Sequence, residues 1–233
     1  KSGFEAMHQA DVLLLLGTDF PYSEFLPEKC KIIQIDTKPE KLGRRAKVDY
    51  GYCGDIKSTL EDLLPLVEVK TATDFLDKTR SLHQEIEAIY ESYVAEKGSE
   101  KNIHPEYVAY MVDKLADDDA IFTVDTGMSA VWAARYLKAG ANRCLTGSFN
   151  HGSMANAMPM AIGAGLSQPD RQVIAFCGDG GISMLLGDLM TISQYQIPVK
   201  IIIFNNRSLA MVKLEMRVEG YMDWQTDMVN PDF

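Results

Sequence analysis

This chain of 233 residues carries a formal net charge of −10, which argues against nucleic-acid binding because no basic patch offsets repulsion from phosphates. Its 46% hydrophobic and 24% charged residues are ordinary for a globular protein of one or two domains. No apolar run has membrane-spanning length, and the four cysteines form no CxxC pair, so we expect a cytoplasmic protein with reduced thiols.

Two apolar runs near the N-terminus, residues 10–17 and 31–36, are predicted to form buried parallel strands. Thr18 to Tyr22 form the turn after the first strand, and Asp36 closes the second. Both features therefore lie at the carboxyl edge of a sheet, where α/β proteins bind ligands and a carboxylate commonly meets a ribose hydroxyl. A helix is predicted over residues 56–67, with Asp55 as its N-cap.

A charged pattern with apolar positions at helical spacing extends over residues 71–100 and predicts a helix that crosses between two domains. A second domain is expected from His104 onward. Within it, residues 171–177 and 199–204 are predicted to form neighbouring parallel strands, with a helix over residues 184–194 between them.

Two polar turns follow these two strands, Gly178-Asp179-Gly180-Gly181 and Asn205-Asn206. A carboxylate and an amide oxygen at one sheet edge suit a Mg²⁺ ion that also holds a diphosphate. The glycines, and a helix expected to begin near Ile182, would let backbone N–H groups approach a phosphate. Gly-Asp-Gly alone is also common turn chemistry, but the strand-turn-helix setting and the spacing favour the ligand site.

This spacing resembles the signature of the thiamine diphosphate-dependent enzymes, in which GDG is followed by NN at the end of the next strand. Residues 17–22, 130–138, 147–159 and 178–188 resemble the FAD- and thiamine diphosphate-dependent pyruvate oxidases, particularly the quinone-linked type. The similarity is weakest between residues 69 and 102. It implies an α/β fold of doubly wound parallel sheets: the latter part of a Rossmann-like FAD-binding domain (1–68), an interdomain helical linker (69–103) and a diphosphate-binding domain (104–233).

The resemblance also implies site residues. Mg²⁺ would be ligated by the side chains of Asp179 and Asn206 and by the backbone carbonyl of Ser208. Met154, which from the residues alone is a core methionine, would be the wedge that bends the cofactor. The implied contacts to thiamine diphosphate are Gly152, Ser153, Met154, Asp179, Gly180, Gly181, Asn206, Arg207, Ser208, Leu209, Ala210, Met211 and Val212.

The implied FAD contacts are Thr18, Asp19, Phe20, Pro21, Tyr22 and Asp36. The implied substrate pocket contains Glu215, Met211, Val212 and Thr126. Met211 stands where relatives often carry phenylalanine, and Glu215 lies one turn beyond it on the same helix face. A glutamate on a helix face is as often simply solvated, so both interpretations of Glu215 stay open.

The resemblance implies oxidative decarboxylation of pyruvate or a related 2-oxo acid, with electrons passing through FAD to a quinone or oxygen and acetate or acetyl phosphate as product. Two alternatives stay open. One is a carboligase of the acetolactate synthase kind, or a 2-oxo acid decarboxylase, with structural FAD. The other is a non-enzymatic cofactor-binding remnant, against which the presence of both Asp179 and Asn206 argues.

The ends of the chain lead us to expect a fragment, truncated at its C-terminus, because it lacks an initiating methionine and stops where a helix should begin. In the family, the glutamate that activates the cofactor comes from a pyrimidine-binding domain of a neighbouring subunit. We therefore expect an inactive fragment of a homo-oligomer, a dimer at least and a tetramer by resemblance. The quinone-linked type also implies peripheral contact with the inner face of the membrane through regions outside this chain.

Overall fold

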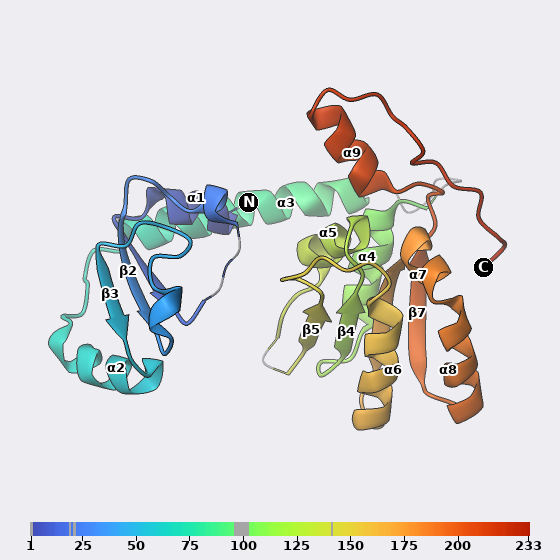
Figure 1. Cartoon of the computed structure of the whole chain (residues 1–233), viewed down its shortest axis with the longest axis horizontal. Helices are drawn as coiled ribbons and strands as arrows, with labels where there is room; N and C mark the ends of the chain where they lie inside the picture. The colour runs from blue at the N-terminus through green and yellow to red at the C-terminus, as the bar shows by residue number, and fades with distance from the viewer. Residues whose placement is uncertain (1, 19, 21, 96–102, 141) are drawn as a thin grey trace. The chain divides into compact units, whose positions relative to one another are not determined.

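The computed structural model describes residues 2–18, 20, 22–95, 103–140 and 142–233 (Figure 1). The chain forms two compact units, Lys1–Ile89 and Tyr90–Phe233, and the boundary falls within helix α3 (Asp74–Ala95). The helix predicted over residues 71–100 is present as α3, and residues 96–100 of that range lie outside the described part of the chain. The predicted domain limits at residues 68 and 103 stay a prediction.

The first unit contains a parallel sheet in the order β1-β2-β3. Its elements are α1 (Ser2–Gln9), β1 (Val12–Leu16), η1 (Ser23–Phe25), β2 (Lys31–Asp36), η2 (Pro39–Lys41), β3 (Tyr50–Cys53), α2 (Ile56–Leu63) and η3 (Leu64–Leu66). Both predicted strands are thus present. The prediction that both are buried holds for β2 but is wrong for β1, whose Val12, Leu14 and Leu16 are exposed. β1 lies at the edge of the described sheet, so fewer neighbours cover its side chains.

Helix α2 begins as predicted, because the Asp55 side chain accepts a hydrogen bond from the Ser58 backbone N–H at 2.9 Å. The prediction that this helix continues to residue 67 is wrong, because the α-helix ends earlier. α2 ends at Leu63, and residues Leu64–Leu66 form a 3-10 turn. Pro65 accounts for the change, because its ring nitrogen cannot donate the next helical hydrogen bond.

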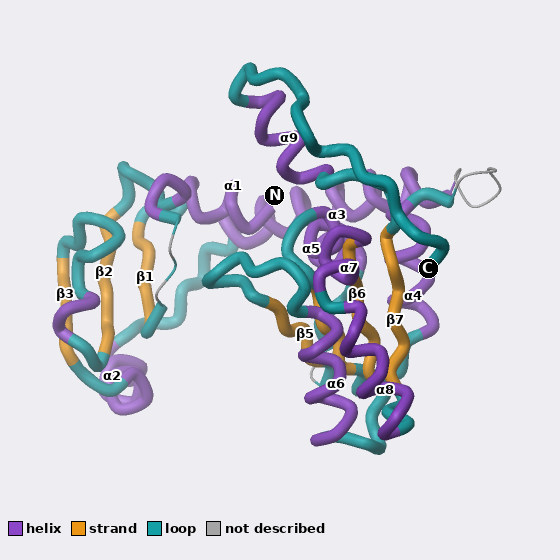
Figure 2. Tube along the Cα trace, turned by 45° about the vertical axis from the view of Figure 1, so that its right-hand side comes forward, coloured by secondary structure: helices purple, strands orange, loops and turns teal. Residues whose placement is uncertain are grey.

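The second unit contains a four-stranded parallel sheet in the order β5-β4-β6-β7. Strands β5, β6 and β7 are labelled in Figure 2. Its elements are the end of α3, then α4 (Pro105–Leu115), β4 (Ile121–Val124), α5 (Met128–Tyr136), β5 (Cys144–Gly147), α6 (Ala157–Ser167), β6 (Val173–Gly178), α7 (Asp179–Met184), η4 (Leu186–Asp188), α8 (Leu189–Tyr195), β7 (Val199–Phe204) and α9 (Ala210–Val218).

Alternate side chains of the central strands face two separate cores. Phe122, Val124 and Phe176 pack with Ala109 of α4 and Ala133 of α5. On the other face, the side chains of β4 and β6 pack against α6; this core includes Ile121, Val173, Ala175, Cys177, Ala157, Met158 and Ala161. Helices cover both faces of a parallel sheet, so the predicted α/β fold class is confirmed. No helix within the described ranges is long and apolar enough to cross a membrane.

The helix predicted over residues 184–194, beginning near Ile182, is wrong in its details. α7 begins at Asp179, directly after the extended Gly178. The backbone then leaves helical geometry at Leu185 (φ −130°, ψ 32°), and α8 starts at Leu189. Gly180 and Gly181 are buried within α7. Tertiary contacts therefore override the weak intrinsic helix preference of these glycines.

The packing of α6 against the Ile197–Val199 segment can be tested at Gly165. A Cβ atom there would lie 2.6 Å from Ile197 Cγ2 and 3.1 Å from Val199 Cγ1. We expect Gly165→Ala to lower the free energy of unfolding by about 1–3 kcal/mol through overpacking. The matched control is Gly163→Ala on the same helix, where the Cβ enters open space. Chemical denaturation should show a lower free energy of unfolding for Gly165→Ala and a higher one for Gly163→Ala, because alanine favours the helix where its methyl group meets no obstruction.

Candidate functional site

A cavity of about 550 Å³ lies at the carboxyl ends of β4, β6 and β7. Its wall contains Thr126 and Gly127 after β4, Gly178 to Gly181 at the end of β6 and the start of α7, and Asn205 and Asn206 after β7. The strands are parallel and in register, with Val124 opposite Phe176 and Gly178 opposite Phe204, so their ends meet at one edge. The two predicted motifs are therefore adjacent in space.

Asp179 is a buried carboxylate, 3% exposed, that is held by three donors. The Gly180 backbone N–H donates to its Oδ1 at 2.9 Å. The Arg207 backbone N–H and the Asn230 amide donate to its Oδ2 at 2.6 and 2.8 Å. Arg207 reaches this position with a left-handed backbone, φ +55°. These bonds fix the carboxylate in one orientation.

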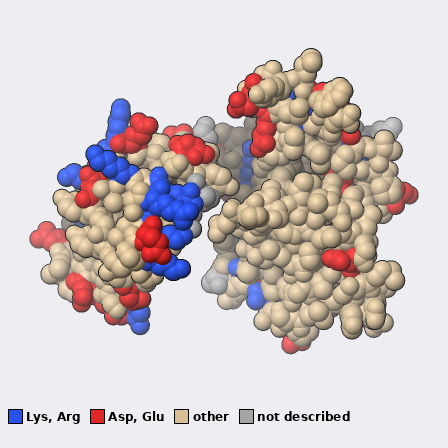
Figure 3. Space-filling view, viewed as in Figure 1, with Lys and Arg blue, Asp and Glu red and all other residues tan. Residues whose placement is uncertain are grey.

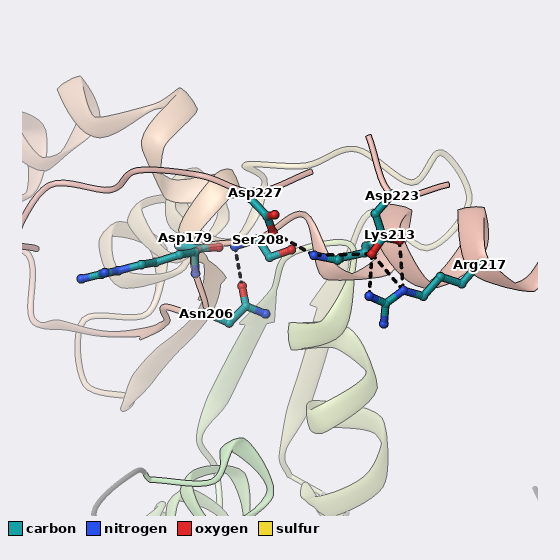
Figure 4. A network of polar contacts seen from close by, with 8 residues as sticks. Asp179, Asn206, Ser208, Lys213, Arg217, Asp223 and Asp227 are labelled. Atoms are coloured by element: carbon teal, nitrogen blue, oxygen red, sulfur yellow. Dashed lines mark hydrogen bonds and ion pairs between the residues drawn. The ribbon is translucent and has the colours of Figure 1, made fainter. Parts of the chain in front are cut away.

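The turn after β7 supplies further oxygen atoms beside Asp179 (Figure 4). The Asn206 side-chain oxygen accepts a hydrogen bond from the Ser208 N–H at 3.0 Å, which closes a local turn. The Ser208 hydroxyl is buried and has no hydrogen-bond partner in the described chain. A buried polar group without a partner is costly unless a ligand or water satisfies it.

The oxygen atoms around Asp179 suit a hard cation that also binds a phosphate. Nowhere in the described residues do three His, Cys, Asp or Glu side chains gather to hold a metal. A cation at Asp179 would therefore need amide, carbonyl and ligand oxygens, which is the way Mg²⁺ is commonly held beside phosphates. Asn206, Ser208 and the glycines of the turn provide such groups and the space for them.

Gly152 and Met154 approach the cavity from the loop before α6. The Met154 side chain is 38% exposed, so the alternative of a core methionine is wrong. Its methyl carbon lies 3.3 Å from where a Cβ at Gly180 would stand, and Leu209 Cδ2 lies 2.8 Å from that point. A side chain at position 180 would thus push apart two residues of the cavity wall.

Helix α9 forms another wall with Ala210, Met211, Val212 and Glu215. The site residues predicted for this unit line the cavity, with two exceptions, Ser153 and Arg207. Ser153 donates its backbone N–H to the Ser148 hydroxyl, and Arg207 contributes through its backbone. The wall also contains apolar residues that were not predicted as site residues, among them Val108 and Trp132.

Two further residues escaped the sequence analysis. Asn230 donates to Asp179 and, at 2.9 Å, to the side-chain oxygen of Asn205. Asp125 follows β4 and is 1% exposed; its Oδ1 accepts from the Ala157 N–H at 2.9 Å and its Oδ2 from the Gly178 N–H at 3.2 Å. The apolar run 121–124 ending in Asp-Thr-Gly was an available signal for Asp125. For Asn230 the local sequence carried none.

Burial governs the ionisation of Asp125 and its neighbour Cys177. Removal from water raises the pKa of Asp125, and the backbone N–H groups of Ala157 and Gly178 partly offset that effect. Burial, followed by the nearby Asp125 charge, raises the pKa of Cys177 to about 12. Cys177 is therefore a protonated, structural thiol rather than a nucleophile.

The chain after α9 folds back toward the site and is held there by charged side chains (Figure 4). Lys213 pairs with Asp227 at 2.9 Å and with Asp223 at 3.8 Å, while Arg217 Nε donates to Asp223 at 3.0 Å. Backbone bonds from Leu209 to Thr226 and from Met228 to Arg207 add a short antiparallel contact. This return brings Asn230 to Asp179.

Of the predicted flavin residues in the first unit, Thr18, Phe20 and Tyr22 follow β1, and Asp36 is the last residue of β2. The Thr18 hydroxyl accepts from the Phe20 N–H at 3.2 Å, and Phe20 packs edge-to-face on Tyr22. Asp36 is buried, and its Oδ1 accepts from the Lys38 N–H at 2.9 Å. Asp19 and Pro21 lie outside the described residues. The flavin assignment of this group stays a prediction.

Two family models match the chain. The central domain of thiamine pyrophosphate enzymes matches residues 1–63, and their C-terminal TPP binding domain matches residues 125–233.

Similar curated proteins include a Bacillus subtilis (strain 168) protein named thiamine pyrophosphate-containing protein YdaP, 37% identical over all of this chain and 40% of its own length. Pyruvate oxidase of Lactiplantibacillus plantarum is 32% identical over all of this chain and 38% of its own length. The acetolactate synthase large subunit of Lactococcus lactis is 31% identical over 89% of this chain and 36% of its own length. The chain thus spans about two fifths of the length of these relatives.

The role of Asn230 can be tested by Asn230→Ala. Loss of the amide removes one of the donors that orient Asp179, and we expect Mg²⁺ affinity in the presence of thiamine diphosphate to fall about ten-fold. Val229→Ala is the control, because the Val229 side chain is fully exposed on the same segment. Calorimetric titration of the full-length protein should separate the two variants. Equal Mg²⁺ affinity in both would contradict the role given to Asn230.

Proposed function

Because the chain belongs to the thiamine pyrophosphate enzymes, we propose that its cavity binds thiamine diphosphate with Mg²⁺ and that the protein decarboxylates pyruvate or a related 2-oxo acid. The observation that carries this proposal is the buried Asp179 carboxylate, oriented by three donors beside Asn206 and Ser208. A cavity of about 550 Å³ is within the range of cofactor sites.

In this proposal, the side chains of Asp179 and Asn206 and the backbone carbonyl of Ser208 would hold Mg²⁺, which would supply positive charge for the diphosphate. Gly180 keeps the turn free of a side chain, so that Met154 and Leu209 reach the cavity and shape it. When bound, the cofactor supplies a nucleophilic carbon and accepts the electrons released by decarboxylation. Thr126 and Glu215, on separate walls of the cavity, are placed to contact the 2-oxo acid.

We further propose that electrons pass to FAD at Thr18, Asp19, Phe20, Pro21, Tyr22 and Asp36, and then to a quinone or oxygen, with acetate or acetyl phosphate as product. The identity to pyruvate oxidase over the whole chain supports this branch. Met211, where relatives often carry phenylalanine, would lie at the reacting centre of the pocket. A cytoplasmic location, with peripheral membrane contact through regions outside this chain, belongs to the same proposal.

A second candidate is an acetolactate synthase-like carboligase with structural FAD. Its support is the 31% identity to the Lactococcus lactis enzyme, close to that for pyruvate oxidase. The two candidates differ in where the electrons released by decarboxylation would go. In the oxidase they would pass to the flavin, whereas in the carboligase a second 2-oxo acid would take them up in a new carbon–carbon bond and the flavin would stay oxidised.

An oligomeric enzyme is part of the proposal. Few charged side chains lie on the visible face formed by α6, α7 and α8 (Figure 3), and α6 and α8 contain no Asp, Glu, Lys or Arg. Exposed apolar side chains of α6, α7, α8 and the segment between α7 and α8 include Leu166, Met184, Leu186, Leu189, Met190 and Tyr195. Uncharged faces of this kind are typical of protein interfaces, which supports a homo-oligomer, a dimer at least and a tetramer by resemblance.

Anaerobic addition of pyruvate to the full-length protein tests the choice between the two candidates. We expect the flavin absorbance near its visible maximum to bleach, and acetate or acetyl phosphate to accumulate when quinone, or oxygen with phosphate, is supplied. Acetolactate formation with an unbleached flavin would favour the carboligase instead. A protein that binds no flavin would overturn the oxidase branch while leaving the thiamine diphosphate site intact.

The metal assignment is tested by Asp179→Ala. We expect at least about a hundred-fold loss of Mg²⁺-dependent thiamine diphosphate affinity, because a direct ligand is removed along with its charge. Asp170→Ala is the matched control, since it removes an exposed carboxylate near the opposite end of β6. Cofactor binding followed by calorimetry gives the readout. An Asp179→Ala variant that binds as tightly as the parent would sink the assignment.

A further inference from the structure

Asp125 is a fully buried carboxylate that lies behind the wall of the cavity. It follows β4 at 1% exposure, and none of the ion pairs of the described residues includes it. Its main chain is fixed as well, because its N–H donates to the Phe176 carbonyl at 2.9 Å and its carbonyl accepts from the Ser129 hydroxyl at 3.1 Å. A buried charge of this kind is costly unless hydrogen bonds compensate for the lost water.

The two oxygens of Asp125 bind two different segments of the cavity wall. Oδ2 accepts from Gly178, the residue before Asp179, and Oδ1 accepts from Ala157, which follows the loop carrying Gly152 and Met154. Both partners are N–H donors, so both oxygens must act as acceptors. A carboxylate can do this, whereas an amide has one acceptor and one donor end.

Gly181 leaves the space that this carboxylate occupies. A Cβ at position 181 would lie 2.9 Å from Asp125 Cγ, closer still to Oδ2, and 3.3 Å from the Ala155 backbone nitrogen. Its neighbour Gly180 makes no such approach to Asp125. The second glycine of the Asp-Gly-Gly turn is therefore required by Asp125, independently of any phosphate.

We propose that Asp125 is a positioning residue that sets the separation between the diphosphate turn after β6 and the loop before α6. The proposal rests on the proposed thiamine diphosphate site, whose two ends these segments would hold. Asp125 itself does not line the cavity, so it acts through Gly178 and Ala157. The geometry couples the metal end of the site to the wall that carries Met154.

The first test compares Asp125→Asn with Thr123→Val in the full-length protein. Thr123 is equally buried on the same strand, and its hydroxyl donates to the Ala157 carbonyl at 2.7 Å. Thr123→Val therefore removes a buried bond to the same residue without affecting Gly178. We expect Asp125→Asn to weaken thiamine diphosphate binding about 10- to 100-fold, and Thr123→Val to leave it within about two-fold even if both variants melt earlier.

A second test keeps the Asp125 carboxylate but adds a methyl group where that carboxylate lies. We expect Gly181→Ala to weaken cofactor binding as Asp125→Asn does, while Gly163→Ala, whose Cβ meets open space, leaves binding unchanged. In an Asp125→Ala background, the added methyl group should have little further effect, so the two changes should be strongly non-additive. Gly181→Ala remains informative if Asp125→Asn fails to fold.

Calorimetric cofactor affinity, with Mg²⁺ in excess, is the readout for all of these proteins. Equal losses in Asp125→Asn and Thr123→Val, or parent-like binding in Gly181→Ala, would overturn the positioning role while the proposed site stands. A parent protein that binds no thiamine diphosphate would instead overturn the proposed function, and the positioning role with it.

Discussion

Parallel pairing of β4, β6 and β7 is the constraint on which the candidate site depends. The pairing places Val124 opposite Phe176 and Gly178 opposite Phe204, so residues far apart in the chain end at one edge of the sheet. Each polar turn begins where a buried apolar strand stops, because backbone and side-chain polar groups can find partners or solvent only there. Helices on both faces leave that edge as the open one, and the cavity forms at it.

Two buried carboxylates lie at this edge and differ in their access to the cavity. Asp179 and Asp125 are both almost inaccessible. Among the described residues, their hydrogen-bond donors are backbone N–H groups and, at Asp179, also the Asn230 amide, and no Lys or Arg side chain pairs with either carboxylate. Asp179 lines the cavity, where its charge can attract a cation, whereas Asp125 lies behind the wall. A buried carboxylate attracts a positive ion, but it can bind one only where the ion can reach it from the cavity. Only Asp179 satisfies that condition.

The segment after α9 shows how modest interactions can hold a functional group in place. The ion pairs of Lys213 and Arg217 lie at or near the surface, where water and salt weaken the attraction, so each pair by itself contributes little to stability. Together with the backbone contact between residues 207–209 and 226–228, they fix the return of the chain. As a result, the Asn230 amide binds Asp179, although the two residues are 51 positions apart in the sequence.

The sequence by itself determined the fold class, the strands on either side of the two motifs and, through their spacing, the thiamine diphosphate family that the family models confirm. These are properties of short stretches, because hydrophobic runs and turn residues act locally. Only the tertiary structure decided that α7 begins at Asp179, that Met154 faces a cavity, and that Asp125 and Asn230 hold the site. Those features depend on hydrogen bonds and close approaches between distant residues, such as Asp125 with Gly178 and Gly181, and no local pattern encodes such contacts.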